Sequence, residues 1–138
     1  MSAVIETGNE AGIASTEIST TPDVTPLSAE TIPLDGRLFG TVASAGAGSG
    51  VRFEYTEADG LLHVRYAGGN VQLGYRVGTR SGNHLAFRYA ELAVGGDSAS
   101  GRVDARIELL GDGRVRLREI WAVDSRRGEG ASIVEELH

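Results

Sequence analysis

Tyrosine, tryptophan and glutamate side chains recur at every second position of several short segments, and they are the residues of this sequence best suited to chemistry. A tyrosine hydroxyl, an indole N–H or a neutral carboxyl group can donate a hydrogen bond to a carbonyl oxygen and stabilise charge that develops there. Our candidates for this catalytic role are Tyr55, Tyr75, Glu119 and Trp121. Because Glu119 lies in mid-segment, two residues before Trp121, we expect it in the interior; a structural pairing with arginine is an equal alternative.

Five further residues share this alternation and would line a substrate-binding site: Phe53, Tyr66, Leu73, Phe87 and Tyr89. A core that serves only stability favours Leu, Ile and Val, whereas tyrosine and tryptophan suit a cavity that holds a mostly apolar ligand with a few polar groups. A solidly packed interior is the alternative interpretation. Glu91 and Glu135 follow the same alternation, and we expect both in water at strand ends.

The composition excludes several kinds of catalytic and metal site. The chain has no cysteine, and all 13 of its basic residues are arginines. Thiolate chemistry, Schiff bases and a lysine general base are therefore excluded. His63, His84 and His138 lack the spacing of metal ligands, and the sequence has no Gly-x-Ser-x-Gly nucleophile motif. We expect neither a metal nor a cofactor.

The charge of the chain disfavours polyanionic partners. The formal net charge is −6, so we expect no binding to nucleic acid or to an anionic membrane. Two rows of arginines would form cross-strand ion pairs with Asp104 and Glu108: Arg102, Arg106, Arg114, Arg116 and Arg118. No apolar run reaches the roughly 20 residues of a membrane span, and no signal peptide is visible, so we expect a cytoplasmic protein.

An all-β fold must position these residues. From Gly36 onward, alternating segments are separated by glycine-bearing turns, the signature of an antiparallel meander. We predict eight strands: Arg37–Ser44, Val51–Glu57, Leu62–Tyr66, Val71–Val77, His84–Glu91, Arg102–Leu109, Arg114–Val123 and Ala131–Leu137. In Val71–Val77 we assign the odd-numbered residues to the interior and Arg76 to the outer face. Because a flat sheet would expose two edges and an apolar face, we expect an eight-stranded antiparallel up-and-down β-barrel.

Residues 1–33 form a predicted acidic N-terminal extension, and residues 34–138 form the predicted barrel domain. Residues 1–36 contain acidic residues and no basic residue. We interpret the extension as a lid on the mouth of the barrel, because a lid excludes water and holds a flexible substrate in place. Its anchors would be isolated aliphatic side chains: Ile5, Ile13, Ile18, Val24, Leu27 and Ile32.

Six segments carry a resemblance to a group of small bacterial β-proteins whose members often bear the label N-acetylglutamate synthase. They are Leu34-Asp35-Gly36-Arg37-Leu38-Phe39, Val51-Arg-Phe-Glu-Tyr55, Tyr66-Ala-Gly-Gly-Asn-Val71, Leu73-Gly-Tyr-Arg-Val-Gly78, Gly111-Asp-Gly-Arg-Val-Arg-Leu-Arg-Glu-Ile-Trp121 and Ser132-Ile-Val-Glu-Glu-Leu137. The resemblance covers Asp35 to Leu137. The sequence has neither the α/β pattern nor the pyrophosphate loop of an acetyl-CoA-dependent transferase, so that activity is not carried over.

The small, cofactor-free barrel with its N-terminal extension also resembles the calycin-like β-barrel cyclases of polyketide and antibiotic biosynthesis. This group includes the spirotetronate cyclases, which catalyse 4+2 cycloadditions (Diels–Alder type). The resemblance implies a barrel that encloses a linear polyene and a segment that caps its mouth. It assigns no catalytic residue to a position of this sequence.

Two functions remain open at this stage. One is a cofactor-independent intramolecular cyclase of the 4+2 type, which acts on a polyketide-derived intermediate held in the lumen. The other is a non-catalytic barrel that binds a hydrophobic small molecule as a carrier or sensor. Both need the same cavity, so the sequence does not separate them. A homodimer or larger homo-oligomer with a filled barrel is a third interpretation.

Overall fold

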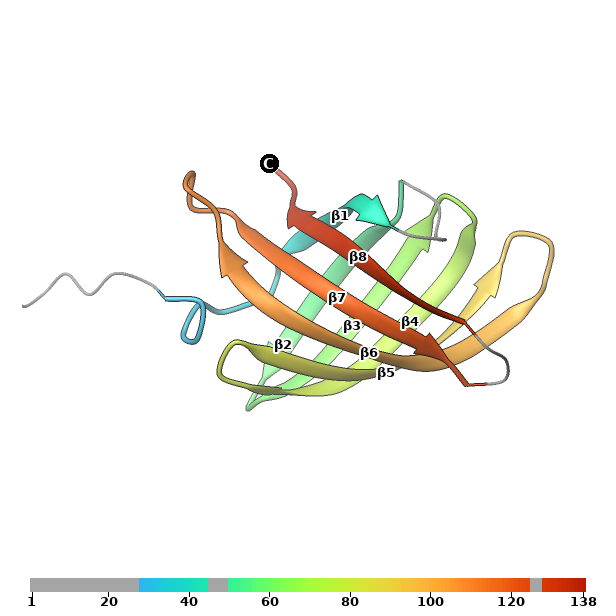
Figure 1. The fold of residues 1–138 in the computed structure, drawn as a ribbon, viewed down its shortest axis with the longest axis horizontal. Helices are drawn as coiled ribbons and strands as arrows, with labels where there is room; N and C mark the ends of the chain where they lie inside the picture. Colours follow the sequence, from blue (N-terminus) through green and yellow to red (C-terminus); the bar gives the residue numbers. More distant parts are fainter. Residues whose placement is uncertain (1–27, 45–49, 125–127) are drawn as a thin grey trace, which may run out of the picture.

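Eight antiparallel strands close into one barrel in the computed structural model, which describes residues 28–44, 50–124 and 128–138 (Figure 1). The strands follow one another around the barrel in chain order: β1 (Leu38–Ser44), β2 (Arg52–Ala58), β3 (Leu61–Gly68), β4 (Val71–Ser81), β5 (His84–Ala93), β6 (Ser98–Leu109), β7 (Val115–Val123) and β8 (Glu129–Glu136). Because β8 pairs with β1, the sheet has no free edge. The predicted eight-stranded up-and-down barrel is confirmed. No helix in the described part of the chain is long and apolar enough to cross a membrane.

Period-two alternation produces the barrel, because consecutive side chains of a strand point to opposite faces of the sheet. In β3 and β6 every second residue is buried, and its neighbours are exposed. The outer faces carry part of the expected cross-strand ion pairs: Glu108 on β6 lies 2.7 Å from Arg118 and 3.8 Å from Arg116 on β7. Asp104 lies 3.6 Å from His84 instead, and no described arginine forms an ion pair with it. The outward charges and inward apolar residues together determine which face of each strand forms the core.

Residues 28–36 close one end of the barrel. Ile32 and Leu34 are 2% and 0% exposed and belong to the core. The backbone N–H of Leu34 donates to the Glu57 carboxylate at 2.8 Å, which ties the segment to the end of β2. This is the end that holds the β2–β3, β4–β5 and β6–β7 turns, on the left in Figure 1. Among the described residues, the buried core therefore begins at Ile32, two residues before the predicted start of the barrel domain.

Most of the predicted lid lies outside the described residues. Residues 1–27 include every proposed anchor except Ile32, and Ile32 packs in the core at the closed end. The glycine-rich loop expected between the first two strands, 45–49, is also outside the described residues. The lid stays a prediction.

A β-bulge in β4 overturns the predicted facing of that strand. The register with β5 shifts between Val71 and Leu73. A bulge adds one residue to one strand, and every residue after it then faces the opposite side. The prediction that Tyr75 points inward is therefore wrong: its side chain is 42% exposed and stacks on His63, with ring centroids 5.6 Å apart. Arg76 points into the barrel and is 6% exposed, so its assignment to the outer face is also wrong.

Glycines at inward positions make room for aromatic rings. Gly74 on β4 stands opposite Tyr66 on β3, and a Cβ atom at Gly74 would lie 2.3 Å from the Tyr66 ring. Gly101 on β6 stands opposite Tyr89 on β5, and a Cβ atom there would lie 2.8 Å from the Tyr89 ring. Each ring thus lies over the neighbouring strand and leaves the centre of the barrel open.

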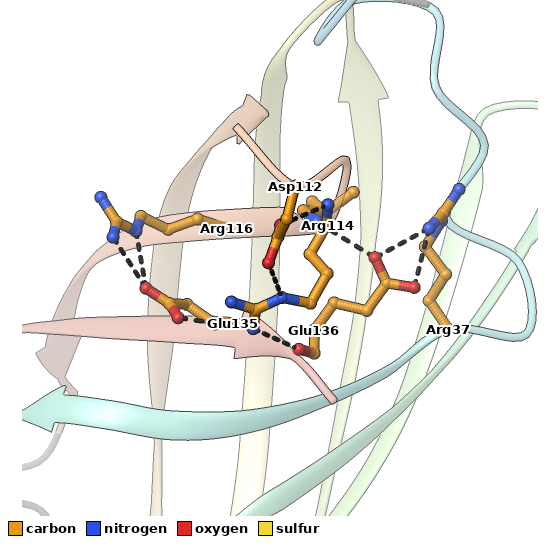
Figure 2. Close-up of polar contacts among 7 residues, drawn as sticks. Arg37, Asp112, Arg114, Arg116, Glu135 and Glu136 are labelled. Atoms are coloured by element: carbon orange, nitrogen blue, oxygen red, sulfur yellow. Dashed lines mark hydrogen bonds and ion pairs between the residues drawn. The ribbon is translucent and has the colours of Figure 1, made fainter. Parts of the chain in front are cut away.

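A network of ion pairs joins the residue before β1, the β6–β7 turn, β7 and β8 near the closed end. Figure 2 shows its charged members: Arg37, Asp112, Arg114, Arg116, Glu135 and Glu136. The Glu136 carboxylate accepts from Arg37 at 2.8 Å and from the backbone N–H of Val115 at 3.0 Å. Glu135 forms an ion pair of 2.8 Å with Arg116 across the β7–β8 pair. Side chains thus reinforce the seam at which the last strand meets the first.

Candidate functional site

A cavity of about 660 Å³ occupies the half of the barrel opposite residues 28–36. It opens between the β3–β4 and β5–β6 turns, which contribute Asn70 and Asp97 to its mouth. Known ligand pockets measure about 300–1,000 Å³, so this cavity has room for one small organic molecule. The lining residues come from all eight strands and three of the connections between them: Thr41, Val51, Phe53, Tyr66, Asn70, Val71, Arg76, Tyr89, Glu91, Ala93, Asp97, Ser98, Ala99, Val103, Glu119, Trp121, Val123, Ser132 and Val134.

Five of the nine predicted site residues lie around this cavity: Phe53, Tyr66, Tyr89, Glu119 and Trp121. They come from β2, β3, β5 and β7, so only closure of the sheet brings them together. This agrees with the expectation of a hollow barrel. Their roles in catalysis or substrate binding stay predictions.

The other four predicted site residues are not in the cavity wall. Tyr55 and Phe87 are buried below it in the packed half of the core, with ring centroids 6.1 Å apart. Tyr75 and Leu73 lie on the outward-facing side of β4 that follows the bulge. The core is therefore solid at its closed end and hollow at its open end, which combines the two interpretations of the sequence.

Burial keeps Tyr55 protonated. Removal of its hydroxyl from water raises its pKa well above the usual range, and the nearby charge of Glu119 raises the pKa further. A tyrosine in this state can donate a hydrogen bond but cannot act as a base near neutral pH. Since Tyr55 also lies outside the cavity wall, direct contact with a bound molecule is not expected.

Arg76 and Glu119 form a buried ion pair across the lumen. Nη1 of Arg76 lies 2.7 Å from Oε2 of Glu119, and Nη2 lies 3.3 Å from Oε1. The two residues sit on β4 and β7, three strands apart in the barrel, and they are 6% and 2% exposed. Both line the cavity, with the packed core of Tyr55 and Phe87 on the other side. We name this pair the crossbar.

Aromatic rings surround the guanidinium of the crossbar. The Cζ atom of Arg76 lies 4.7 Å from the ring centroid of Phe53, 5.2 Å from that of Tyr66 and 5.7 Å from that of Phe87. Burial works to lower the pKa of Arg76, but the charge and hydrogen bonds of Glu119 outweigh it and raise the pKa above its ordinary value. The guanidinium stays charged, and cation–π contacts add to its stabilisation.

The crossbar determines what Glu119 can do. Its expected interior position is confirmed, and of the two roles considered for it, the structure contains the pairing with arginine. Both oxygens of the Glu119 carboxylate accept charge-assisted hydrogen bonds from Arg76. Arg76 has five N–H donors and gives two of them to Glu119. Its Nε–H is buried and has no acceptor among the described residues.

Glu91 lines the cavity instead of standing in water at the rim, which corrects the sequence-based expectation. The Tyr66 hydroxyl donates to Oε1 of Glu91 at 2.8 Å. Gly74 on the intervening strand permits this contact, because Tyr66, Gly74 and Glu91 stand side by side on β3, β4 and β5. Burial and the adjacent carboxylate raise the pKa of Tyr66, so the hydroxyl stays protonated and remains the donor.

The indole of Trp121 is held in place by Ser132. Its Nε1–H donates to the Ser132 hydroxyl at 3.1 Å across the β7–β8 pair. The ring is partly buried and forms part of the cavity wall. As the protein's single tryptophan, it is also a built-in fluorescent reporter of the cavity.

Sequence reasoning missed Arg76 and Asp97, and a signal for Arg76 was present. Gly74 and Gly78 flank Arg76 at a spacing of two residues. In a strand, this spacing places all three residues on one face. Glycine inside a strand often marks a close approach of other groups, which indicates the crowded interior here. Asp97 lies in a turn, where alternation gives no information.

The family model described as avidin-like protein matches residues 32–137. The match begins at the first core residue of the closed end and includes all eight strands. It supports the calycin-like barrel implied by the resemblance; it extends neither to the synthase label nor to the cyclases. The search of curated proteins finds no match to the chain. The search of solved structures finds none either.

Proposed function

The chain belongs to the avidin-like protein family, and from this premise and the geometry of the cavity we propose that it binds one small organic molecule in the open half of the barrel. One observation carries the proposal: a cavity of about 660 Å³ with aromatic walls ends on a buried ion pair instead of a packed apolar floor. Buried ion pairs contribute little net stability compared with apolar residues of similar volume. A role in ligand recognition accounts for this one.

The ligand that fits best is mostly apolar, with a few polar atoms. Phe53, Val103 and Trp121 provide apolar walls, and Arg76 can donate a hydrogen bond to an oxygen atom at the inner end. Side chains within the wall are already held by Tyr66–Glu91 and Trp121–Ser132 hydrogen bonds. A wall fixed before binding loses little conformational entropy when the ligand enters.

Trp121 fluorescence tests this function. We expect N-phenyl-1-naphthylamine, a neutral apolar fluorophore, to quench Trp121 with saturation at one molecule per chain. Val103→Phe fills part of the cavity and should weaken binding about tenfold or more. Val77→Phe, on the exposed outer face of β4, is the matched control and should not change it. Equal affinity of the parent and a folded Val103→Phe variant would place the probe elsewhere and contradict the proposal.

A second candidate function is the intramolecular cyclase. The observation that favours it is the position of the crossbar, which lies at the inner end of the cavity. A 4+2 cycloaddition forms two carbon–carbon bonds from a diene and an alkene without adding or losing atoms, so confinement of the reacting ends is the main requirement. In this mechanism Arg76, rather than Glu119, would donate to the carbonyl group that activates the alkene.

The cyclase is tested with a linear polyene that carries both reacting groups. Turnover would give a product of unchanged mass with a new retention time and new ring protons in its NMR spectrum. The Val103→Phe variant should abolish the acceleration, and Val77→Phe should retain it. Binding of the polyene without acceleration over the uncatalysed rate would assign the protein to the carriers or sensors.

A further inference from the structure

The charges that line the cavity are unbalanced. Among its described lining residues, three are acidic and one is basic: Glu91, Asp97, Glu119 and Arg76. The crossbar neutralises Glu119. Glu91 and Asp97 form no ion pair with any residue that the structure describes. The outer part of the cavity thus has an excess of two carboxylates, next to rings that extend from the wall.

The crossbar shows how this barrel holds a cation. The guanidinium of Arg76 lies between the rings of Phe53, Tyr66 and Phe87, and Glu119 supplies the countercharge. A carboxylate together with aromatic faces is the usual arrangement for a buried organic cation. The protein therefore contains one occupied example of such a site at the inner end of its cavity.

Glu91 repeats this arrangement nearer the mouth, without a cation from the protein. Its Oε1 atom accepts from Tyr66, and no described residue donates to Oε2. Tyr66, Tyr89 and Trp121 line the same space, and Asp97 stands at the opening. A half-buried carboxylate gains more from a cationic partner than an exposed one, because water screens the pair less.

We infer that the bound molecule is a small organic cation, such as a protonated amine, with its charged nitrogen between Glu91 and Asp97 and its apolar part toward Val103 and the crossbar. This inference rests on the proposed binding function and names the class of ligand. The N–H groups of an ammonium can also donate hydrogen bonds to Oε2 of Glu91, which accepts none from the described residues. The mouth carboxylates would in addition attract a cation from solution.

Three probes that share one skeleton test the charge preference: 2-(2-naphthyl)ethylammonium, 2-(2-naphthyl)ethanol and 3-(2-naphthyl)propionate. Their dissociation constants are measured with the full chain by calorimetry and by Trp121 fluorescence. We expect the ammonium to bind about tenfold more tightly than the alcohol, and the carboxylate to bind most weakly. The preference for the ammonium should decrease with added salt.

Charge-neutral variants identify the residues responsible. Glu91→Gln with Asp97→Asn keeps an acceptor for Tyr66 and should reduce the preference of ammonium over alcohol to about twofold or less. Glu54→Gln with Asp104→Asn, both on outer faces, is the matched control and should leave the preference unchanged.

The outcomes separate this inference from the function on which it rests. Tighter binding of the alcohol or the carboxylate, or an unchanged preference in the Glu91/Asp97 variant, would overturn the cation assignment and leave the binding function in place. If none of the three probes nor N-phenyl-1-naphthylamine binds, both the binding function and the cation assignment fail.

Discussion

At the scale of single residues, the crossbar is the most demanding feature of this protein. Arg76 and Glu119 are both removed from water, and each compensates the charge of the other. Loss of one partner would leave a buried charge without compensation, whereas loss of both would not. Replacement of one partner should therefore lower the free energy of unfolding much more than replacement of both.

We predict that Arg76→Met lowers the free energy of unfolding by about 3–5 kcal/mol, because Glu119 then remains buried and unpaired. The double variant Arg76→Met/Glu119→Leu should recover most of this loss, since two apolar side chains need no compensation. Urea unfolding followed by Trp121 fluorescence gives both values. A single variant as stable as the parent would mean that water or another group reaches Glu119.

At the scale of secondary-structure elements, the bulge and the glycines of β4 shape the cavity. The bulge turns Arg76 inward. Gly74 then allows the Tyr66 ring to cross β4 and reach Glu91. Strand β4 thus supplies Arg76, the cation of the crossbar, and Gly74, which leaves room for the Tyr66 ring in the cavity wall.

Gly74→Ala should lower the free energy of unfolding by about 1–3 kcal/mol, because its Cβ atom overlaps the Tyr66 ring and the ring must move. The Tyr66–Glu91 hydrogen bond would be lost with that movement. Adding Tyr66→Leu should recover part of the stability, since the smaller side chain leaves room for the methyl group. Gly111→Ala is the control: no atom lies within 4 Å of its Cβ position, and stability should change little.

The network at the closed end makes a pH-dependent contribution. Arg114 donates to Asp112 from Nε at 2.7 Å and from its backbone N–H at 3.0 Å, and these bonds hold the pKa of Asp112 below its ordinary value of 3.8. A lowered pKa in the folded state means that the pair stabilises the fold above the ordinary value. Its contribution disappears as the pH falls through the lowered value.

Asp112→Asn should therefore lower the midpoint of thermal unfolding at pH 7 by a small amount, and the difference from the parent should shrink as the pH falls below 3.8. Glu54→Gln, at an exposed position on the outer face of β2, is the control and should show no such pH-dependent difference. A difference between Asp112→Asn and the parent that grows on acidification would contradict the assigned direction of the pKa shift.

At the scale of the whole molecule, the barrel has one closed and one open end. Ile32 and Leu34 seal the closed end, and the cavity opens at the other. The chain preceding residue 28 therefore joins the barrel at the end away from the mouth. A fully extended chain spans about 3.3–3.6 Å per residue, so 27 residues are long enough to reach the mouth. The predicted lid is compatible with this geometry.

Two truncations separate a lid from a part of the core. Deletion of residues 1–27 should leave the unfolding midpoint nearly unchanged, because the seal remains. Deletion of residues 1–33 removes Ile32, and the loss should be similar to that of Ile32→Ala, about 2–5 kcal/mol. Faster release of N-phenyl-1-naphthylamine after the shorter deletion would support the lid. An unchanged release rate would refute it.

The local sequence pattern was sufficient to predict the strands and part of the candidate site. The side-chain period of a strand is two residues, and glycine-bearing turns interrupt it, so eight strands and their hairpin order could be predicted from neighbouring residues alone. The interior position of Glu119 follows from the same period, as do those of Phe53, Tyr66 and Trp121.

Only the tertiary structure decided which residues of β4 point into the barrel and which side chain pairs with Glu119. A bulge is one residue of irregular pairing, and it inverts every later position, so Arg76 and Tyr75 exchange sides without a change in the alternating pattern. The crossbar joins strands that are three apart, and closure of the sheet alone brings them together. An inward-facing ring packs in the solid core if it lies near the closed end, which Ile32 and Leu34 seal. It lines the cavity if it lies nearer the open end. For this reason Tyr66 lines the cavity and Tyr55 does not, although both point inward and both belong to the core.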